Sequence, residues 1–216
     1  GFLFSRAVLE ETGPWPFHLL TEDIQFSVHE ILQGRKVAFA PDAVLYDEQP
    51  TTFRQSWNQR LRWSKGFYQV DAKYTGSLLR GCTRGGREGM SCYDMLMTVA
   101  PCNLFTIAVL ALSIIVCVTS LTQPAFITYR AMRVLGRIFW LTLRGITASL
   151  FLFGAVTMAA EWKRIAGPVH KKILYTFKFP LFMLTYVPIS VAALVGKVEW
   201  RPIRHGIASS NSSIES

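Results

Sequence analysis

Residues 21–23, Thr21-Glu22-Asp23, place two carboxylates directly ahead of an amphipathic segment. This segment is predicted to be a helix that ends at Gly34. One interpretation is structural: Thr21 caps the helix, and the carboxylates favour the positive end of its dipole. The other is chemical, because a carboxylate fixed at a helix N-terminus and facing a cleft can act as a general base. The local sequence leaves both interpretations open.

A second group of polar side chains follows in the stretch QRLRW, residues 59–63. Gln59, Arg62 and Trp63 are spaced i, i+3 and i+4, so they share one face of a predicted helix. Gly66 lies on the same face and leaves room for the close approach of another segment. This face therefore offers an amide, a guanidinium and an indole.

Those three groups suit a sugar diphosphate. The planar fork of arginine binds phosphate oxygens, tryptophan offers a flat apolar surface to a pyranose ring, and glutamine can hydrogen-bond a hydroxyl. The alternative is an amphipathic helix at a membrane interface, with arginines that snorkel and a tryptophan that anchors. Residues 59–63 by themselves do not decide between the two.

The elements that must position these residues can be predicted from periodicity and turn signals. Helices are expected at 5–12, 22–33 and 52–73. Two short strands, Val37–Ala40 and Val44–Tyr46, are expected around a turn at Pro41-Asp42. The glycine- and arginine-rich residues 75–89 are expected to form a mobile linker.

Beyond residue 90 the composition changes to apolar. Each of three apolar stretches is long enough to span a bilayer, which takes roughly 20 residues. Basic residues cluster beside apolar segments, so the net charge of +9 fits a cytoplasmic membrane surface better than nucleic acid, for which no motif stands out. The expected spans are 95–119, 138–160 and 173–196, and the last of these crosses the membrane, re-enters it or lies at its interface.

The chain has four cysteines and no C-x-x-C pair. Spacing of this kind indicates neither a zinc site nor a disulfide framework. We expect Cys82, Cys92, Cys102 and Cys117 to be small core residues.

The order of the motifs carries more information than either motif alone. Thr21-Glu22-Asp23, then Gln59-Arg60-Leu61-Arg62-Trp63, then apolar spans, resembles the processive family 2 glycosyltransferases of membranes. These are the cellulose, chitin, hyaluronan and poly-N-acetylglucosamine synthases. The resemblance is strong over roughly residues 1–80 and lies in architecture beyond them.

The resemblance implies an α/β fold followed by a helical transmembrane region. Residues 1–50 would be the C-terminal part of a GT-A-like catalytic domain, and 51–90 an interface helix with a basic linker. Residues 91–205 would form the transmembrane region and 206–216 a disordered tail. The protein would be a multi-pass protein of the plasma membrane with its catalytic part in the cytoplasm.

The resemblance also implies a role for each motif residue. Asp23 would be the catalytic base of an inverting transfer from a nucleotide sugar to a growing polysaccharide. The substrate-binding residues would be Thr21, Glu22, Gln59, Arg60, Arg62 and Trp63. N-acetylglucosamine is the expected sugar, with glucose and glucuronate open, and transfer of a single sugar remains an alternative to polymer synthesis.

One departure limits this comparison. The family's D-x-D motif, which holds a divalent metal, does not occur here, so this chain offers no metal ligands. We expect a fragment of a longer protein that lacks the donor-binding half and is inactive alone, while the intact parent uses magnesium or manganese. The alternative function is a non-catalytic membrane protein whose basic peripheral domain binds lipids or a partner.

Overall fold

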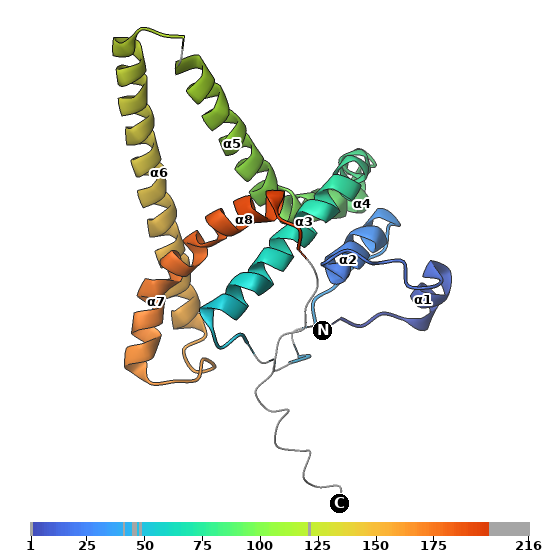
Figure 1. Cartoon of the computed structure of the whole chain (residues 1–216). Coiled ribbons are helices and arrows are strands. Elements are labelled where there is room, and N and C mark those ends of the chain that lie inside the picture. The colour runs from blue at the N-terminus through green and yellow to red at the C-terminus, as the bar shows by residue number, and fades with distance from the viewer. Residues whose placement is uncertain (1, 41, 45–46, 48, 121, 199–216) are drawn as a thin grey trace, which may run out of the picture. The chain divides into compact units, whose positions relative to one another are not determined.

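The computed structural model describes residues 2–40, 42–44, 47, 49–120 and 122–198, with the backbone alone for 101–106 and 110 (Figure 1). The described residues form helices and no strand: α1 (Arg6–Thr12), α2 (Glu22–Leu32), α3 (Phe53–Cys82), α4 (Gly86–Val99), α5 (Pro101–Ser120), α6 (Ala125–Ala160), α7 (Val169–Leu184) and α8 (Tyr186–Val195). They fall into two compact units. One holds the residues up to Thr106 together with those from Ile189, and the other is Ile107–Pro188.

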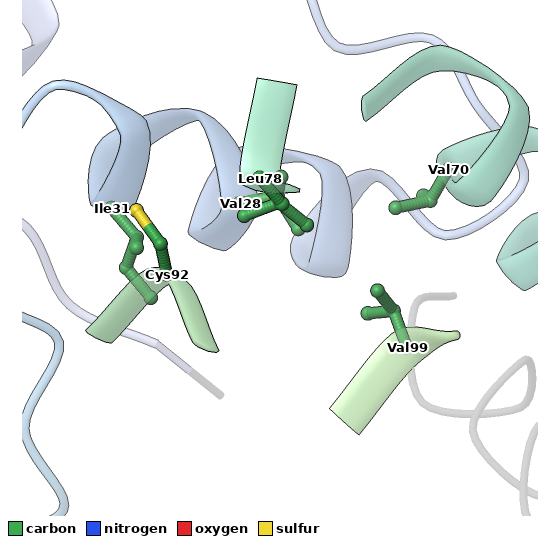
Figure 2. Packing of buried hydrophobic residues seen from close by; sticks show 6 residues of the cluster. All are labelled: Val28, Ile31, Val70, Leu78, Cys92 and Val99. Carbon is green, nitrogen blue, oxygen red and sulfur yellow. The ribbon is translucent and has the colours of Figure 1, made fainter. Parts of the chain in front are cut away.

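The core of the first unit is built by α2, α3 and α4. Each helix contributes two residues that are almost fully buried, and Figure 2 shows their side chains gathered in one cluster. Burying a valine, leucine or isoleucine side chain contributes about 1.5–3 kcal/mol, so this cluster holds the three helices together. The six residues are Val28, Ile31, Val70, Leu78, Cys92 and Val99.

Helix α2 agrees with its prediction from the sequence. It begins at Glu22 and ends at Leu32, and Gly34 follows with a φ of 79° and donates its N–H to the carbonyl of Ile31 at 3.0 Å. A glycine adopts this left-handed conformation without steric cost, so Gly34 closes the helix. Arg84 donates to the carbonyl of Leu32 at 2.8 Å and satisfies one of the last helix carbonyls.

An ion-paired group ties the end of α2 to α1. Arg35 donates to the carboxylates of Glu30 and Glu11. The hydrogen bond that Arg35 donates to Glu30, which is itself buried, raises the pKa of Arg35 above its ordinary value. The segment that leaves α2 is therefore fixed against the first helix.

Helix α3 starts as predicted and runs further than predicted. Thr52 accepts from the N–H of Gln55 at 3.3 Å, and the Gln55 side chain accepts from the N–H of Thr52 at 3.3 Å, which is a capping box. The helix then continues to Cys82 instead of ending near 73. The prediction of a mobile linker at 75–89 is wrong, because most of this stretch belongs to α3 and α4.

The glycines of this stretch serve helix packing. A Cβ on Gly81 would lie 2.5 Å from Sγ of Cys92, and a Cβ on Gly89 would lie 2.9 Å from the carbonyl oxygen of Cys82. The absence of these side chains lets α3 and α4 approach closely. Of the four predicted core cysteines, Cys92 is fully buried in the resulting contact and Cys82 is half-buried. The prediction is wrong for Cys117, which is exposed on α5, and the side chain of Cys102 lies outside the description.

The predicted strand Val37–Ala40 is not formed, and of Val44–Tyr46 only Val44 lies within the described residues, where it is not in a strand. Val37, Phe39 and Val44 are 58%, 89% and 69% exposed. A strand pair without neighbouring strands or a packed face is marginal at best in water, and no described segment supplies either. The α/β class predicted from the sequence is therefore not seen in the described residues.

The last turn of α8 packs on α3 within the first unit. Lys65 of α3 donates from Nζ to the carbonyl oxygens of Ala193 at 3.0 Å and Leu194 at 3.5 Å. A cation at a helix C-terminus is stabilised by the helix dipole and satisfies carbonyls that have no helical partner. Ile189 and Ala193 are fully buried at this contact.

In the second unit, α6 and α7 pack along each other through aromatic side chains. The rings of Phe151 and Phe177 are 5.0 Å apart. A Cβ on Gly154 would lie 2.8 Å from Cδ1 of Phe179, so this glycine makes room for the ring. Large apolar side chains of α6 nevertheless remain exposed, among them Leu152, Phe153 and Val156.

Two helical stretches are long and apolar enough to cross a membrane, Ala125–Ala160 and Val169–Val195. The first contains the predicted span 138–160, and the second contains all but the last residue of the predicted span 173–196. The second includes the break between α7 and α8 at Thr185. The first predicted span, 95–119, is not one helix, because α4 ends at Val99 and α5 begins at Pro101.

The domain boundaries predicted at residues 50, 90 and 205 stay predictions, and the predicted tail lies outside the described residues.

Candidate active site

The two carboxylates of the first motif lie in the first turn of α2 and point to solvent. Glu22 and Asp23 are both exposed, and Oδ1 of Asp23 accepts a hydrogen bond from the N–H of Ile24 at 2.8 Å. At the N-terminus of α2 both carboxylates lie beside the positive end of the helix dipole. A charged oxygen is therefore fixed at the surface beside the start of α2.

Thr21 takes the N-cap position but does not cap the helix with its side chain. The prediction that the side chain of Thr21 caps the helix is therefore wrong. Thr21 is 4% exposed, and its Oγ1 is buried without a hydrogen-bond partner among the described residues. The reason is its packing: the side chain is turned toward α3, where it lies against Gly66.

The contact between Thr21 and Gly66 brings the two motifs together. A Cβ on Gly66 would lie 2.5 Å from Cγ2, 2.6 Å from Oγ1 and 2.9 Å from Cβ of Thr21. These distances are too short for any side chain at position 66, so only glycine allows this approach. The close approach that the sequence predicted at Gly66 is confirmed, and its partner is the first residue of the carboxylate motif.

The loop before Thr21 is anchored by amide side chains that the sequence analysis did not identify. Leu19 donates its N–H to Oε1 of Gln25 at 3.1 Å, and Gln25, which is 1% exposed, donates from Nε2 to the hydroxyl of Tyr74 at 3.1 Å. Leu20 donates its N–H to Oε1 of Gln69 at 3.2 Å. These bonds fix the entry to α2 relative to α3.

A pocket of about 200 Å³ opens where the two motifs meet. Leu20, Thr21, Glu22, Asp23 and Ile24 line it from the start of α2. From α3 it is lined by Arg62, Trp63 and Phe67. The predicted helix face thus meets the predicted carboxylates in one concave site.

Two residues of the second motif do not line this pocket. Gln59 lies one turn before Arg62 and Trp63 on α3, beyond the lining residues. Arg60 is 2% exposed and folds back along its own helix, where Nε donates to the carbonyl of Ser56 at 3.2 Å and the guanidinium lies 5.9 Å from the ring of Phe53. The structure therefore places Arg60 inside the fold and away from the pocket.

The residues that line the pocket include two acidic side chains from α2 and one basic side chain from α3. Asp23 and Glu22 can accept protons or hydrogen bonds from a hydroxyl group. Arg62, which forms no ion pair with a described residue, can bind anionic oxygens through its fork. Trp63, 37% exposed, adds a flat apolar surface.

The described residues do not fit a divalent metal site. No group of three or more His, Cys, Asp or Glu side chains among them is placed to hold a metal ion. Glu22 and Asp23 supply only two carboxylates, while Mg²⁺ and Mn²⁺ prefer several oxygen ligands. We therefore assign no step of the chemistry to a metal held by this chain.

Two known proteins with similar sequences are named as glycosyltransferases or polysaccharide synthases. The sequence is 28% identical over 79 residues to the "Probable glycosyltransferase YdaM" of Bacillus subtilis (strain 168), which is 37% of this chain and 19% of that protein. It is 32% identical over 68 residues to the "Poly-beta-1,6-N-acetyl-D-glucosamine synthase" of Staphylococcus aureus (strain COL), which is 32% of this chain and 16% of that protein. The chain thus covers less than a fifth of the length of these relatives. No solved structure matches it significantly.

A family match covers far more of the chain than these pairwise similarities. The family described as "Glycosyl transferase family group 2" matches residues 1–197, which include the pocket and all eight described helices. This chain therefore belongs to glycosyl transferase family group 2.

Proposed function

We propose that the pocket between α2 and α3 is the acceptor side of an inverting glycosyltransferase that elongates a polysaccharide. The observation that supports this proposal is the meeting of Thr21-Glu22-Asp23 with Arg62 and Trp63 in one pocket of about 200 Å³. That volume is below the 300–1,000 Å³ typical of drug-sized ligands, which suits a single sugar ring rather than a whole nucleotide sugar.

In the proposed reaction Asp23 acts as general base. Its carboxylate takes the proton of the acceptor hydroxyl while that oxygen attacks the anomeric carbon of the donor. The bond from the anomeric carbon to the diphosphate oxygen breaks, and the nucleoside diphosphate leaves with the electron pair. Attack on the face opposite the leaving group inverts the configuration at this carbon.

The two residues from α3 hold the reacting groups in this proposal. Trp63 stacks on the terminal sugar of the acceptor, and Arg62 neutralises part of the charge that develops on the diphosphate. Gln59 contacts the substrate outside the described pocket, at the next turn of α3. Arg60 supports α3 from within the fold.

N-acetylglucosamine is the proposed donor sugar. Its support is the relative named as a poly-beta-1,6-N-acetyl-D-glucosamine synthase, which is 32% identical to this chain over 68 residues. The nucleotide-binding part of the donor site and any metal would lie outside the described residues, in the intact protein.

We further propose that the helices after residue 100 anchor the enzyme in the plasma membrane, with the pocket on the cytoplasmic side. The apolar side chains exposed on α6, such as Leu152, Phe153 and Val156 at 60–66%, would form an unusually large apolar surface in water but match lipid. The alternative of a purely lipid- or partner-binding protein does not account for a pocket that is lined by Glu22 and Asp23 together with Arg62 and Trp63.

A donor panel tests the proposal. Membranes that contain the protein expressed from its complete gene are incubated with radiolabelled UDP-N-acetylglucosamine, UDP-glucose or UDP-glucuronate and with magnesium or manganese. The proposal predicts incorporation from UDP-N-acetylglucosamine into a product of polymer size, as measured by gel filtration. A product that carries one added sugar would limit the enzyme to single transfer, and no incorporation from any donor would contradict the proposed function.

A further inference from the structure

Helix α6 carries its four arginines on one side. Arg130, Arg133, Arg137 and Arg144 are three, four and seven residues apart. At 3.6 residues per turn these spacings place all four within roughly 60° of the helix circumference. All four are exposed. We call these four residues the α6 arginine stripe.

Nothing described in the second unit neutralises the α6 arginine stripe. Helix α6 contains no Asp or Glu, and no ion pair forms between these arginines and a described residue. The one described partner is neutral: Arg133 donates from Nη2 to the hydroxyl of Tyr129 at 2.6 Å, and its guanidinium lies 4.9 Å from the centre of that ring. The stripe therefore presents several unpaired cations in a line.

The length of α6 indicates where this line lies relative to a bilayer. Its 36 residues extend for about 54 Å, while the hydrocarbon core of a bilayer is about 30 Å thick. The C-terminal part, residues 138–160, has only one charge and fills that thickness by itself. The first 13 residues, which carry three of the four arginines, are left for the headgroup layer.

The aromatic residues around the stripe favour the same position. Phe126, Tyr129 and Trp140 are 66%, 62% and 62% exposed. Tyrosine and tryptophan are enriched where a membrane helix passes through the interface between lipid and water. The backbone of Arg144 lies about 10.5 Å further along the helix than that of Arg137, toward the bilayer centre. Its long side chain can extend back toward the headgroups and bring the guanidinium closer to them.

We propose that the α6 arginine stripe binds the phosphates of anionic phospholipids at the membrane surface. Guanidinium groups bind phosphate oxygens in bidentate fashion, and a line of them matches a layer of anionic headgroups in both charge and spacing. Each arginine near an anionic surface strengthens binding by about fivefold. This inference depends on the membrane location of α6 and not on the glycosyltransferase activity.

The test compares lipids retained by purified protein. The protein is reconstituted in vesicles of equal phosphatidylcholine and phosphatidylglycerol and then extracted in mild detergent, and the retained lipids are quantified by mass spectrometry. We expect phosphatidylglycerol to be enriched on the order of tenfold over phosphatidylcholine. The triple variant Arg130→Gln, Arg133→Gln, Arg137→Gln should bring the ratio close to that of the vesicles.

A matched control removes the same charge elsewhere. The variant Lys163→Gln, Arg164→Gln, Lys171→Gln changes the segment after α6 and should keep most of the enrichment. Equal loss of the phosphatidylglycerol enrichment in both triple variants would overturn the proposal. An unchanged lipid ratio in the stripe variant would also overturn it, and loss of a copurifying acidic protein from that variant would then identify a protein as the partner of the stripe.

A second measurement does not depend on the folding of any variant. Raising the salt concentration from 0.05 M to 0.5 M shortens the range of electrostatic attraction, so the enrichment by the wild-type protein should fall several-fold. An enrichment that is insensitive to salt, or absent from the wild type, would also overturn the proposal.

Discussion

Replacing Gly66 by alanine should separate the two halves of the pocket. The new Cβ would lie 2.5 Å and 2.6 Å from the branch atoms of Thr21, and rotation of that side chain could relieve those contacts. Rotation cannot move Cβ of Thr21, which would still be 2.9 Å away, against a normal separation of about 3.5–4.0 Å between carbon atoms. The start of α2 must therefore move by roughly 0.6–1 Å from α3.

Two opposing effects set the change in stability. Overpacking of a tight contact costs about 1–3 kcal/mol, while replacing a glycine inside a helix by alanine contributes about 0.5–1 kcal/mol. We expect Gly66→Ala to lower the free energy of unfolding by about 1–2 kcal/mol. Gly76→Ala is the matched control on the same helix: no atom lies within 4 Å of its added Cβ, so it should raise stability by about 0.5–1 kcal/mol.

The assay measures opening of the core around Cys92, which is fully buried between α3 and α4. Alkylation of this thiol, followed by peptide mass spectrometry, should be faster in Gly66→Ala than in the wild type and slower in Gly76→Ala. In the protein from the complete gene, a shift of about 1 Å at the pocket should also reduce sugar transfer on the order of 10²-fold. Equal alkylation rates in the two variants would refute the packing argument.

Three further outcomes are expected. Trp63→Ala should weaken use of the acceptor and spare nucleotide binding, whereas Trp57→Ala on the same helix should change neither; lost nucleotide affinity in Trp63→Ala would contradict the assignment. Lys65→Met should weaken the last turn of α8 by about 1 kcal/mol, seen as roughly fivefold faster hydrogen exchange there; unchanged exchange would contradict this role. Burial raises the pKa of the Cys92 thiol above its ordinary value of 9.0. The protonated thiol therefore contributes stability to the folded state below pH 9, and this contribution is lost as the pH rises through the raised pKa. Unfolding by denaturant should therefore show a steeper loss of stability above pH 9 in the wild type than in Cys92→Ala, and parallel curves would contradict it.

The bounds of α2, the start of α3 and the polar face of α3 could be predicted because they depend on local spacing. The end of α2 at Gly34 and the shared face of Arg62, Trp63 and Gly66 follow from helical periodicity and from the freedom of glycine. The local composition around Gly81 instead predicts a linker, because glycine and arginine are frequent there. The actual role of Gly81, contact with Cys92 of the next helix, depends on tertiary packing that local composition does not reveal.

The buried polar contacts of the site could not be predicted in this way. Thr21 has the ideal type for a cap, yet packing against Gly66 determines its rotamer. The bonds to Gln69 and Tyr74 join residues 49 positions apart. Only Gln69 has a local signal, because it continues the face of Arg62 and Gly66 at helical spacing.

Sugar transfer by an Asp23→Asn variant tests the central claim most directly. The amide keeps the shape of the carboxylate but cannot accept the proton, so transfer from radiolabelled UDP-N-acetylglucosamine by the complete gene product should fall on the order of 10²–10⁴-fold at equal expression. Asp94→Asn, an exposed position on α4 outside the pocket, should keep wild-type activity. Near-normal polymer synthesis by Asp23→Asn would contradict the assignment of Asp23 as the base and of this pocket as the site of transfer.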